Sequence, residues 1–264
     1  MYTCNSKWEE AVIDTAAVRP GTTQTVRAAM TLRDMIIGGQ LEADQRYTET
    51  QLATMLSMSR TPIRAALQRL TDEGLLSPVP AGGYVMRQFL PSEIAEAIEL
   101  RGTLEGLCVR LLAERGLDRD RTQAIAAISD RIAALLGKTD FTRADLPAYE
   151  RLNAELHQGL VDATESSLLI QEIARANSRP FASASALVGM YEGDHAARSH
   201  LLIGQDHHRI VIEAIRTRQG ARAEAIMREH ARLSQHNLSR AMQTRGALDR
   251  IPGASLIRQP DPAA

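Results

Sequence analysis

The sequence predicts a mainly α-helical protein, with an N-terminal winged helix-turn-helix followed by an all-α bundle of six or seven helices. Apolar residues recur at helical spacing along most of the chain. Extended runs are confined to about 75–79 and 84–89, and the pattern beyond residue 90 is helical, interrupted by Gly and Pro. A length of 264 residues suits two domains of modest size.

Four segments follow from this pattern. Residues 1–20 lack sustained periodicity and predict a flexible arm, 21–89 form the winged domain, 93–244 form the helical domain, and 246–264, with several Gly and Pro, predict a flexible tail. The expected helices are 22–38, 48–56, 60–73, 93–115, 121–136, 146–163, 167–177, 180–191, 203–218 and 221–244.

Local signals bound the elements of the winged domain. Thr48 and Gln51 have the form of a capping box that opens a short helix. Ser59 is the expected N-cap of the next helix, and Gly74 ends it. The run 80–83, Pro-Ala-Gly-Gly, supplies the turn of a hairpin.

The two short helices form a helix-turn-helix if their apolar side chains share one core. The expected core residues are Leu52, Met55, Leu56, Met58, Ile63, Leu67 and Leu70. Arg60, Thr61, Arg64 and Gln68 then lie on the opposite face, and the i, i+4 spacing puts both arginines and Gln68 on one stripe. Such donors suit the major groove of DNA, because Arg can bond a guanine edge with two hydrogen bonds. An ordinary solvated helix face is the alternative.

Charge and composition narrow the class of partner. The formal net charge is −1, but residues 19–89 hold eight arginines against six acidic residues. An aromatic content of 3% disfavours proteins that stack single-stranded bases or RNA on exposed rings. Double-stranded DNA is therefore the nucleic acid that we expect.

Location signals point to the cytoplasm. No apolar run approaches the roughly 18 residues of a spanning helix, so we expect no membrane contact. Glu9, Glu10 and Asp14 stand where a signal peptide needs a basic start and an apolar stretch. Cys4 and Cys108 alone give no disulfide framework.

Arg101 interrupts the apolar stripe of the expected helix 93–115. Burying a guanidinium without an anion is costly, so Arg101 requires a carboxylate from a ligand or from the protein. The two interpretations carry equal weight, and the protein's candidate is Glu105, one turn later.

The histidines form a second group of candidates, since all seven lie at or beyond residue 157. Asn153 and His157 share a helix face at a spacing typical of metal ligands. His208 and His230 lie on two later helices, and a bundle that brings all four side chains together would offer a tetrahedral or octahedral site. Surface or core histidines without a metal are the alternative.

The run SRTPIRAALQRL (59–70), with EGLL shortly after it, resembles the signature of the GntR family of bacterial transcription regulators. The resemblance implies DNA contacts from Ser59, Arg60, Thr61 and Arg64. It also implies that a wing-tip glycine, Gly82 or Gly83, approaches the minor groove. The family's first helix often contributes an Arg where Thr50 stands, so a contact is lost or the operator differs.

The runs at 99–116, 152–160 and 207–230 resemble the FCD ligand-binding domain of the FadR-type branch of this family. Many such domains bind a divalent metal, here zinc or nickel, through an Asp and three His. The matching residues are Asn153, His157, His208 and His230. His207 is the alternative to His208, and the resemblance makes Arg101 the ligand-contacting residue. The first run also resembles vanillate-type (VanR-like) regulators.

Asn153 departs from the commoner Asp. A neutral amide is a poorer ligand, so metal affinity should drop, and a metal-free site is the alternative. A divalent ion among neutral ligands keeps its full charge, and Arg101 adds another, which selects an anion.

We therefore expect a homodimeric repressor that binds a palindromic operator and is released by a small carboxylate effector, an aromatic or a sugar acid. The alternative is a metal-dependent enzyme with an appended DNA-binding module. No HExxH, P-loop or GxSxG motif supports that alternative.

Overall fold

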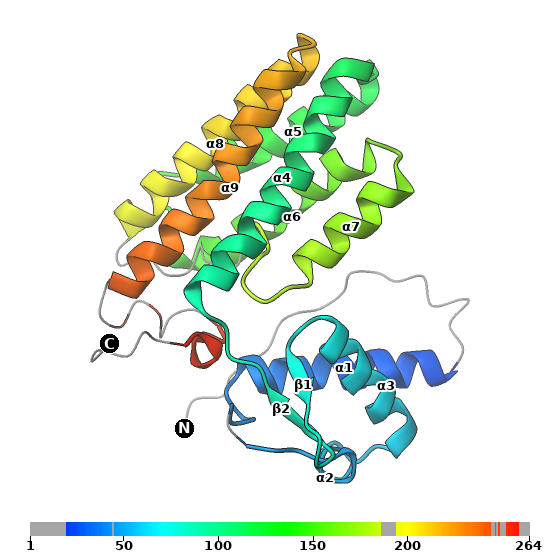
Figure 1. The fold of residues 1–264 in the computed structure, drawn as a ribbon. Helices are drawn as coiled ribbons and strands as arrows, with labels where there is room; N and C mark the ends of the chain where they lie inside the picture. Colours follow the sequence, from blue (N-terminus) through cyan, green and yellow to red (C-terminus); the bar gives the residue numbers. More distant parts are fainter. Residues whose placement is uncertain are drawn as a thin grey trace.

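The computed structural model describes residues 20–43, 45–185, 194–243, 246, 248 and 252–258. It is mainly helical, with a small N-terminal domain below a larger bundle of helices (Figure 1). The predicted fold class is confirmed. The predicted arm, except for Pro20, lies outside the described residues.

The N-terminal domain packs two longer helices and a hairpin around one core. It consists of α1 (Pro20–Ile37), α2 (Glu49–Met55), α3 (Arg60–Asp72), β1 (Leu76–Pro78) and β2 (Tyr84–Met86). The strands pair antiparallel, with Leu76 opposite Met86. The short strands and the helix-turn-helix together give the expected winged arrangement.

The predicted core of this domain holds with one exception. Leu52, Ile63, Leu67 and Leu70 are buried, and Leu56 and Met58 pack against them while partly exposed. Met55 is 51% exposed. It is the last residue of α2, and Leu56, one turn after Leu52, occupies the core position instead.

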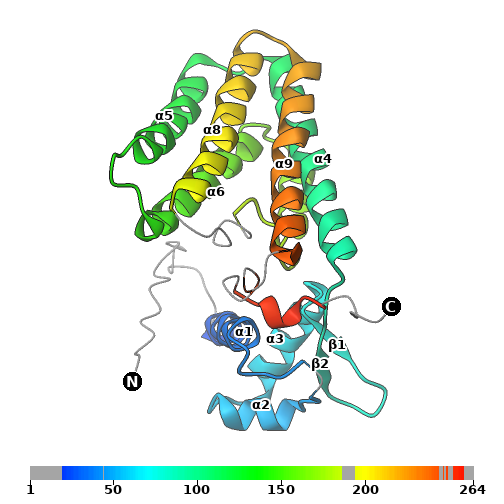
Figure 2. The same ribbon diagram turned by 90° about the vertical axis from the view of Figure 1, so that its left-hand side faces the viewer.

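The helical domain contains α4 (Pro91–Arg115), α5 (Arg119–Leu136), α6 (Leu146–Asp162), α7 (Ser167–Asn177), α8 (Asp194–Arg216) and α9 (Gly220–Gln243). Helices α4 and α9 run side by side in both views (Figures 1 and 2). Gly102 permits their close approach, because a Cβ there would lie 2.4 Å from the Cβ of Ala231. This contact brings Arg101 and His230, the chain neighbours of that pair, to the same depth of the bundle.

The predicted helix 180–191 is wrong in its described part. Residues 180–185 form turns and bends, and the rest of that range lies outside the described residues up to Asp194, where α8 begins. The backbone of Phe181 has φ 63°, a left-handed conformation that a helix cannot continue through. The helix expected at 203–218 therefore starts nine residues earlier than its apolar periodicity indicated.

The expected flexible tail is also wrong where it is described. Leu256 and Ile257 are 1% and 4% exposed. The amide of Phe89 donates to the Leu256 carbonyl at 2.7 Å, and the amide of Arg258 donates to the Phe89 carbonyl at 2.9 Å. The segment 252–258 thus lies between the two domains, against Phe89 in the linker (residues 87–90) that joins β2 to α4 (Figure 2). Burial of two aliphatic side chains outweighs the Gly and Pro content that suggested disorder.

No helix in the described ranges is both long enough and apolar enough to pass through a membrane.

Candidate nucleic-acid interface and metal centre

The side chains expected to read DNA share one exposed surface at the start of α3. Ser59, Arg60, Thr61, Arg64 and Gln68 are all exposed. Ser59 precedes the helix with extended backbone but makes no capping hydrogen bond within the described part of the chain, contrary to its expected capping role. Its hydroxyl is therefore free to bond a phosphate at the helix N-terminus.

Glu49, the first residue of α2, is a member of this surface that the sequence analysis missed. Its carboxylate accepts hydrogen bonds from Nε and Nη2 of Arg64, each at 2.9 Å, and from Nη2 of Arg60 at 3.3 Å. The Arg64 hydrogen bond is the main cause that holds the pKa of Glu49 below its ordinary value. The bond raises the pKa of Arg64 in turn. No helix spacing links Glu49 to residues 11 and 15 positions later, so only the fold reveals the contact.

The two wing glycines differ in their surroundings. Gly83 has φ 88°, and a Cβ there would lie 2.7 Å from the Tyr47 carbonyl oxygen. Gly82 has φ 84°, and its Cβ would meet nothing within 4 Å among the described residues. Gly82 is therefore the glycine that another molecule can approach, while Gly83 is required by the fold. Arg46, also missed from the sequence, donates to the Ala81 carbonyl at 3.2 Å and adds a cation at this tip.

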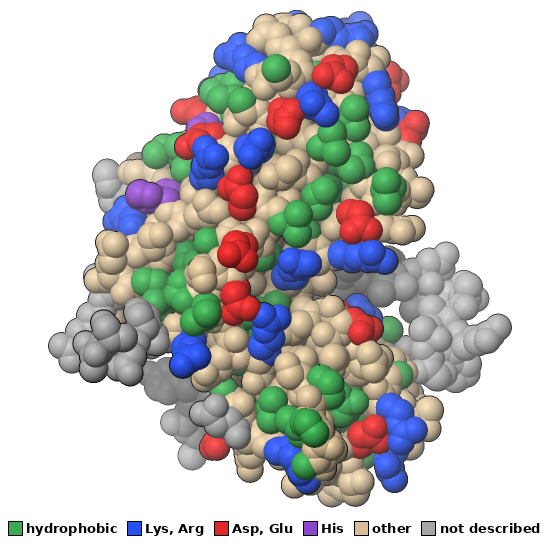
Figure 3. All heavy atoms as spheres, in the orientation of Figure 1, with side chains coloured by type: hydrophobic (Ala, Val, Ile, Leu, Met, Phe, Trp, Pro, Cys, Tyr) green, Lys and Arg blue, Asp and Glu red, His purple; other side chains and the backbone are tan. Residues whose placement is uncertain are grey.

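The described part of the surface shown in Figure 3 has no large region of a single charge. On the face in Figure 3, basic and acidic side chains lie intermingled over the bundle, with hydrophobic side chains between them. The net charge of −1 agrees with this mixture. Among its described residues, this face therefore offers no broad field of one sign that would attract DNA.

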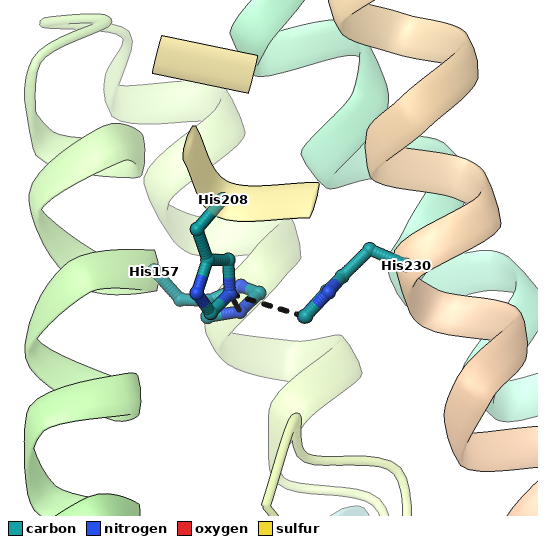
Figure 4. Close-up of side chains that lie close together, drawn as sticks. All are labelled: His157, His208 and His230. Atoms are coloured by element: carbon teal, nitrogen blue, oxygen red, sulfur yellow. Dashed lines mark hydrogen bonds between the residues drawn. The ribbon is translucent and has the colours of Figure 1, made fainter. Parts of the chain in front are cut away.

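Three of the predicted metal ligands meet inside the bundle. His157 on α6, His208 on α8 and His230 on α9 point toward one another (Figure 4). Nε2 of His208 lies 3.4 Å from Nε2 of His157 and 3.2 Å from Nε2 of His230. All three side chains are buried. His207 is half-buried and outside this cluster, so the structure favours His208 of the two neighbours.

A layer of partners surrounds the cluster. Nδ1 of His157 lies 3.0 Å from a Glu105 carboxylate oxygen, and Nδ1 of His208 lies 3.2 Å from Oε1 of Gln205. Such contacts leave Nε2 as the nitrogen that faces the centre, as second partners do for metal-binding histidines. Sequence analysis missed both roles: Glu105 and His157 are 52 residues apart, whereas Gln205 lies within one helical turn of His208 and could have been found from the spacing.

Arg101 lies beside this centre and is fully buried. Its Nη1 donates to Oε2 of Glu105 at 2.6 Å, so the ion pair that was one of the two interpretations is present. Its Nε is buried and has no hydrogen-bond partner among the described residues. The pair thus accounts for only part of the hydrogen-bonding capacity of Arg101.

Asn153 is 1% exposed, one turn before His157 on α6. Its amide nitrogen donates to the Ser185 hydroxyl at 3.0 Å. Its Oδ1 is buried and has no partner in the described part of the structure. A buried amide oxygen without a described partner, on the same helix face as His157, has the chemistry of a fourth metal ligand.

The protonation of the histidines suits a cation. Burial, followed by the charges of neighbouring histidines, lowers the pKa of His208 and of His230 well below the ordinary value. Arg101 contributes to the shift at His230. Both rings are therefore neutral at pH 7 and can offer a lone pair to a metal.

The two nitrogen separations that involve His208 also fit one ion. Two nitrogens bound to zinc at about 2.0–2.1 Å and at tetrahedral angles lie roughly 3.3 Å apart. The observed separations of 3.2 and 3.4 Å match that value. The donor set, three imidazoles and an amide oxygen, is one that zinc or nickel accepts.

A winged helix with an arginine surface, joined to a bundle with a buried histidine centre, defines a two-domain DNA-binding regulator. The family models agree: residues 24–85 match bacterial regulatory proteins of the gntR family, and residues 96–233 match the FCD domain. The chain belongs to the GntR family and carries an FCD domain. It is a DNA-binding transcription regulator and not an enzyme, as its relatives also indicate.

The matches to two curated relatives span most of each chain. The chain is 26% identical over 196 residues to the uncharacterized HTH-type regulator YdhC of Bacillus subtilis, covering 74% of this chain and 83% of YdhC. It is 24% identical over 204 residues to the HTH-type transcriptional repressor GlaR of Escherichia coli, covering 75% and 88%. The family therefore includes repressors.

Solved structures show the same fold. Escherichia coli McbR/YncC superposes with a TM-score of 0.57 at 19% identity, covering 83% of this chain and 97% of that one. A GntR regulator from Rhodococcus gives 0.54 at 19% identity, covering 83% and 99%.

Proposed function

We propose that this protein is a homodimeric repressor whose operator binding is relieved by a small carboxylate held in the buried histidine centre. The observation that carries the proposal is the convergence of three buried histidines beside an arginine whose Nε has no partner among the described residues. With a divalent ion bound, a site of this composition would attract an anion. Aromatic and sugar acids are the effector classes that we infer.

On the DNA side, we assign base reading to Arg60 and Arg64, with support from Gln68, and phosphate contacts to Ser59 and Thr61. The exposure of all five residues supports this assignment. Gly82, and not Gly83, is the wing residue that we assign to the minor groove, because only Gly82 has open space beside it. Two copies of the winged domain would read a palindrome, since one such domain buries too little surface for a unique site.

On the effector side, His157, His208, His230 and Asn153 would hold the ion. A bound zinc or nickel ion would supply a positively charged Lewis acid for the effector's carboxylate. The Arg101 guanidinium and the Glu105 carboxylate cancel each other in charge, so the ion's own charge would remain to select an anion. Arg101 would orient that acid through its Nε.

A route to the DNA-binding domain starts at Asn153. Its amide bonds Ser185, at the end of the segment 178–185. Phe181 in this segment packs edge-on against Phe89 of the linker, with ring centroids 6.2 Å apart. An effector that changes the Asn153 contacts would therefore act on the linker, which is where the two domains join.

Metal content tests the centre. We expect His157→Ala and His230→Ala to lose bound zinc or nickel while keeping the folded structure, with elemental analysis and circular dichroism as the readouts. His236→Ala, outside the histidine cluster, is the matched control and should keep the ion. Equal metal content in the wild type and all three variants would show that the histidine cluster is not a metal site.

A thermal-shift screen of carboxylic acids, with and without a chelator, tests the sensor. We expect an acid to raise the melting temperature only in the metal-loaded protein, because a ligand stabilises the state that it binds. The acid should be recovered unchanged, whereas an enzyme would consume it.

A further inference from the structure

We propose that Glu49 is a positioning residue that orients Arg60 and Arg64 and thereby raises the selectivity of the protein for its operator over other DNA. The inference rests on the reading role proposed above for α3. Glu49 belongs to α2, so its carboxylate reaches the arginines across the helix-turn-helix. The capping box of Thr48 and Gln51 fixes the backbone at this point.

The contact with Arg64 uses one edge of the guanidinium. Glu49 occupies Nε and Nη2, each at 2.9 Å. The end of the guanidinium, formed by Nη1 and the second hydrogen of Nη2, has no hydrogen-bond partner among the described residues, and the side chain is exposed. Two parallel N–H groups remain there, which is the arrangement that bonds O6 and N7 of guanine. Glu49 can therefore hold Arg64 and leave its reading edge available.

Holding these side chains changes the cost of binding. The Arg60 and Arg64 side chains are 62% and 65% exposed, and long exposed side chains lose rotamer freedom when they bond a base. One carboxylate that bonds both arginines restricts that freedom before DNA arrives. The Glu49 side chain is only 20% exposed, so it is the most restricted of the three side chains.

The negative charge of Glu49 also raises the selectivity for the operator. A carboxylate on the DNA-facing surface repels phosphates of any sequence, so it weakens binding wherever the arginines find no matching base. At the operator, the oriented base contacts offset that repulsion. Selectivity then comes from both the orientation of the arginines and the penalty on other DNA.

The test compares two duplexes: one selected by the wild-type protein from a randomised pool, and a scrambled duplex of the same composition. Fluorescence anisotropy gives the affinity for each over a range of salt concentrations. We expect Glu49→Gln to reduce the ratio of the two affinities roughly tenfold, largely by tightening binding to the scrambled duplex. The salt dependence on that duplex should become steeper by about one unit of slope.

Asp34→Asn is the matched control. Asp34 lies on α1, is exposed, and makes no described ion pair with either arginine, so this variant removes the same charge from the same domain. Its affinity ratio should stay within about twofold of the wild type. Glu49→Asp keeps the charge on a shorter side chain, and we expect weak binding to the scrambled duplex with reduced preference for the selected one.

Arg64→Ala separates this inference from the proposed reading surface. If Arg64→Ala removes the preference but Glu49→Gln matches Asp34→Asn, the reading surface stands and the role of Glu49 is overturned. If Arg64→Ala keeps the preference, the reading surface itself is wrong. Thermal unfolding, monitored by circular dichroism, checks that each variant is folded. If Glu49→Gln is not folded, the binding of Glu49→Asp to the two duplexes tests the role of Glu49 instead.

Discussion

Glu105 organises the buried centre through two contacts. Nη1 of Arg101 donates a hydrogen bond to the Glu105 carboxylate at 2.6 Å, and Nδ1 of His157 lies 3.0 Å from the other carboxylate oxygen. All three side chains are buried. Burial opposes the charge of Glu105, but Arg101 and His157 together lower its pKa to about 2. One carboxylate thus compensates the guanidinium and fixes the ring of a proposed metal ligand.

We expect Glu105→Gln to lower the free energy of unfolding by about 3–5 kcal/mol, because it leaves the Arg101 charge buried without its partner. Glu114→Gln, an exposed position on the same helix, is the control and should cost less than about 1 kcal/mol. Urea unfolding at pH 7 measures both. Equal losses of unfolding free energy in the two variants would contradict the claim that the buried Arg101–Glu105 pair is needed for stability.

The same pair gives a pH dependence. The unfolded chain protonates Glu105 near its ordinary pKa of 4.5, whereas the folded protein does so only near 2. The stabilisation from Glu105 is therefore complete above pH 4.5 and is lost as the pH falls toward 2. The difference in unfolding free energy between the wild type and Glu105→Gln should shrink over this range, and a constant difference would contradict the account.

Single residues show where sequence reasoning reaches its limit. Arg101 stands out from sequence because it interrupts an apolar stripe, and its pair with Glu105 follows from i, i+4 spacing. The contacts of Glu49 with Arg64 and of Glu105 with His157 depend on how separate helices pack, which local spacing does not contain.

Elements with strong end signals were predicted well. The capping box at Thr48 and the glycines after α3 and α4 gave bounds within a few residues. The predicted helix at 180–191 failed because periodicity cannot detect the left-handed backbone of Phe181, and the tail was misjudged because burial of Leu256 depends on tertiary packing.

The hairpin offers a prediction at the scale of the element. Gly82→Ala should cost about 1 kcal/mol of stability for a left-handed alanine. Gly83→Ala should cost about 2 kcal/mol more, because its Cβ would also meet the Tyr47 carbonyl, which pairs with Tyr84. Thermal unfolding gives the two values.

For operator affinity the order of the two variants should reverse, with the larger direct effect from Gly82→Ala. Relative to its small loss of stability, Gly82→Ala should weaken operator binding strongly, since we place Gly82 against the minor groove. If Gly82→Ala binds the operator as the wild type does, the wing tip does not approach DNA.

The whole molecule joins its two domains through more than the linker. Phe89, Phe181 and the segment 252–258 pack together where the domains meet, and the core of the winged domain continues through them to Ala231 and Leu238 of α9. Sequence analysis predicted two domains but not this shared core. We propose that a change at the histidine centre reaches the DNA-binding surface through this continuous core.

One measurement tests the central claim that the histidine centre controls DNA binding: the operator affinity of the zinc-loaded protein with and without a stabilising acid from the thermal-shift screen. For the wild type, we expect the acid to weaken operator binding by roughly 5–150-fold, the usual range of coupling between two sites. For His230→Ala, the acid should change the affinity by less than about twofold. An equal response of both proteins, or no response of the wild type to an acid that it binds, would contradict the account.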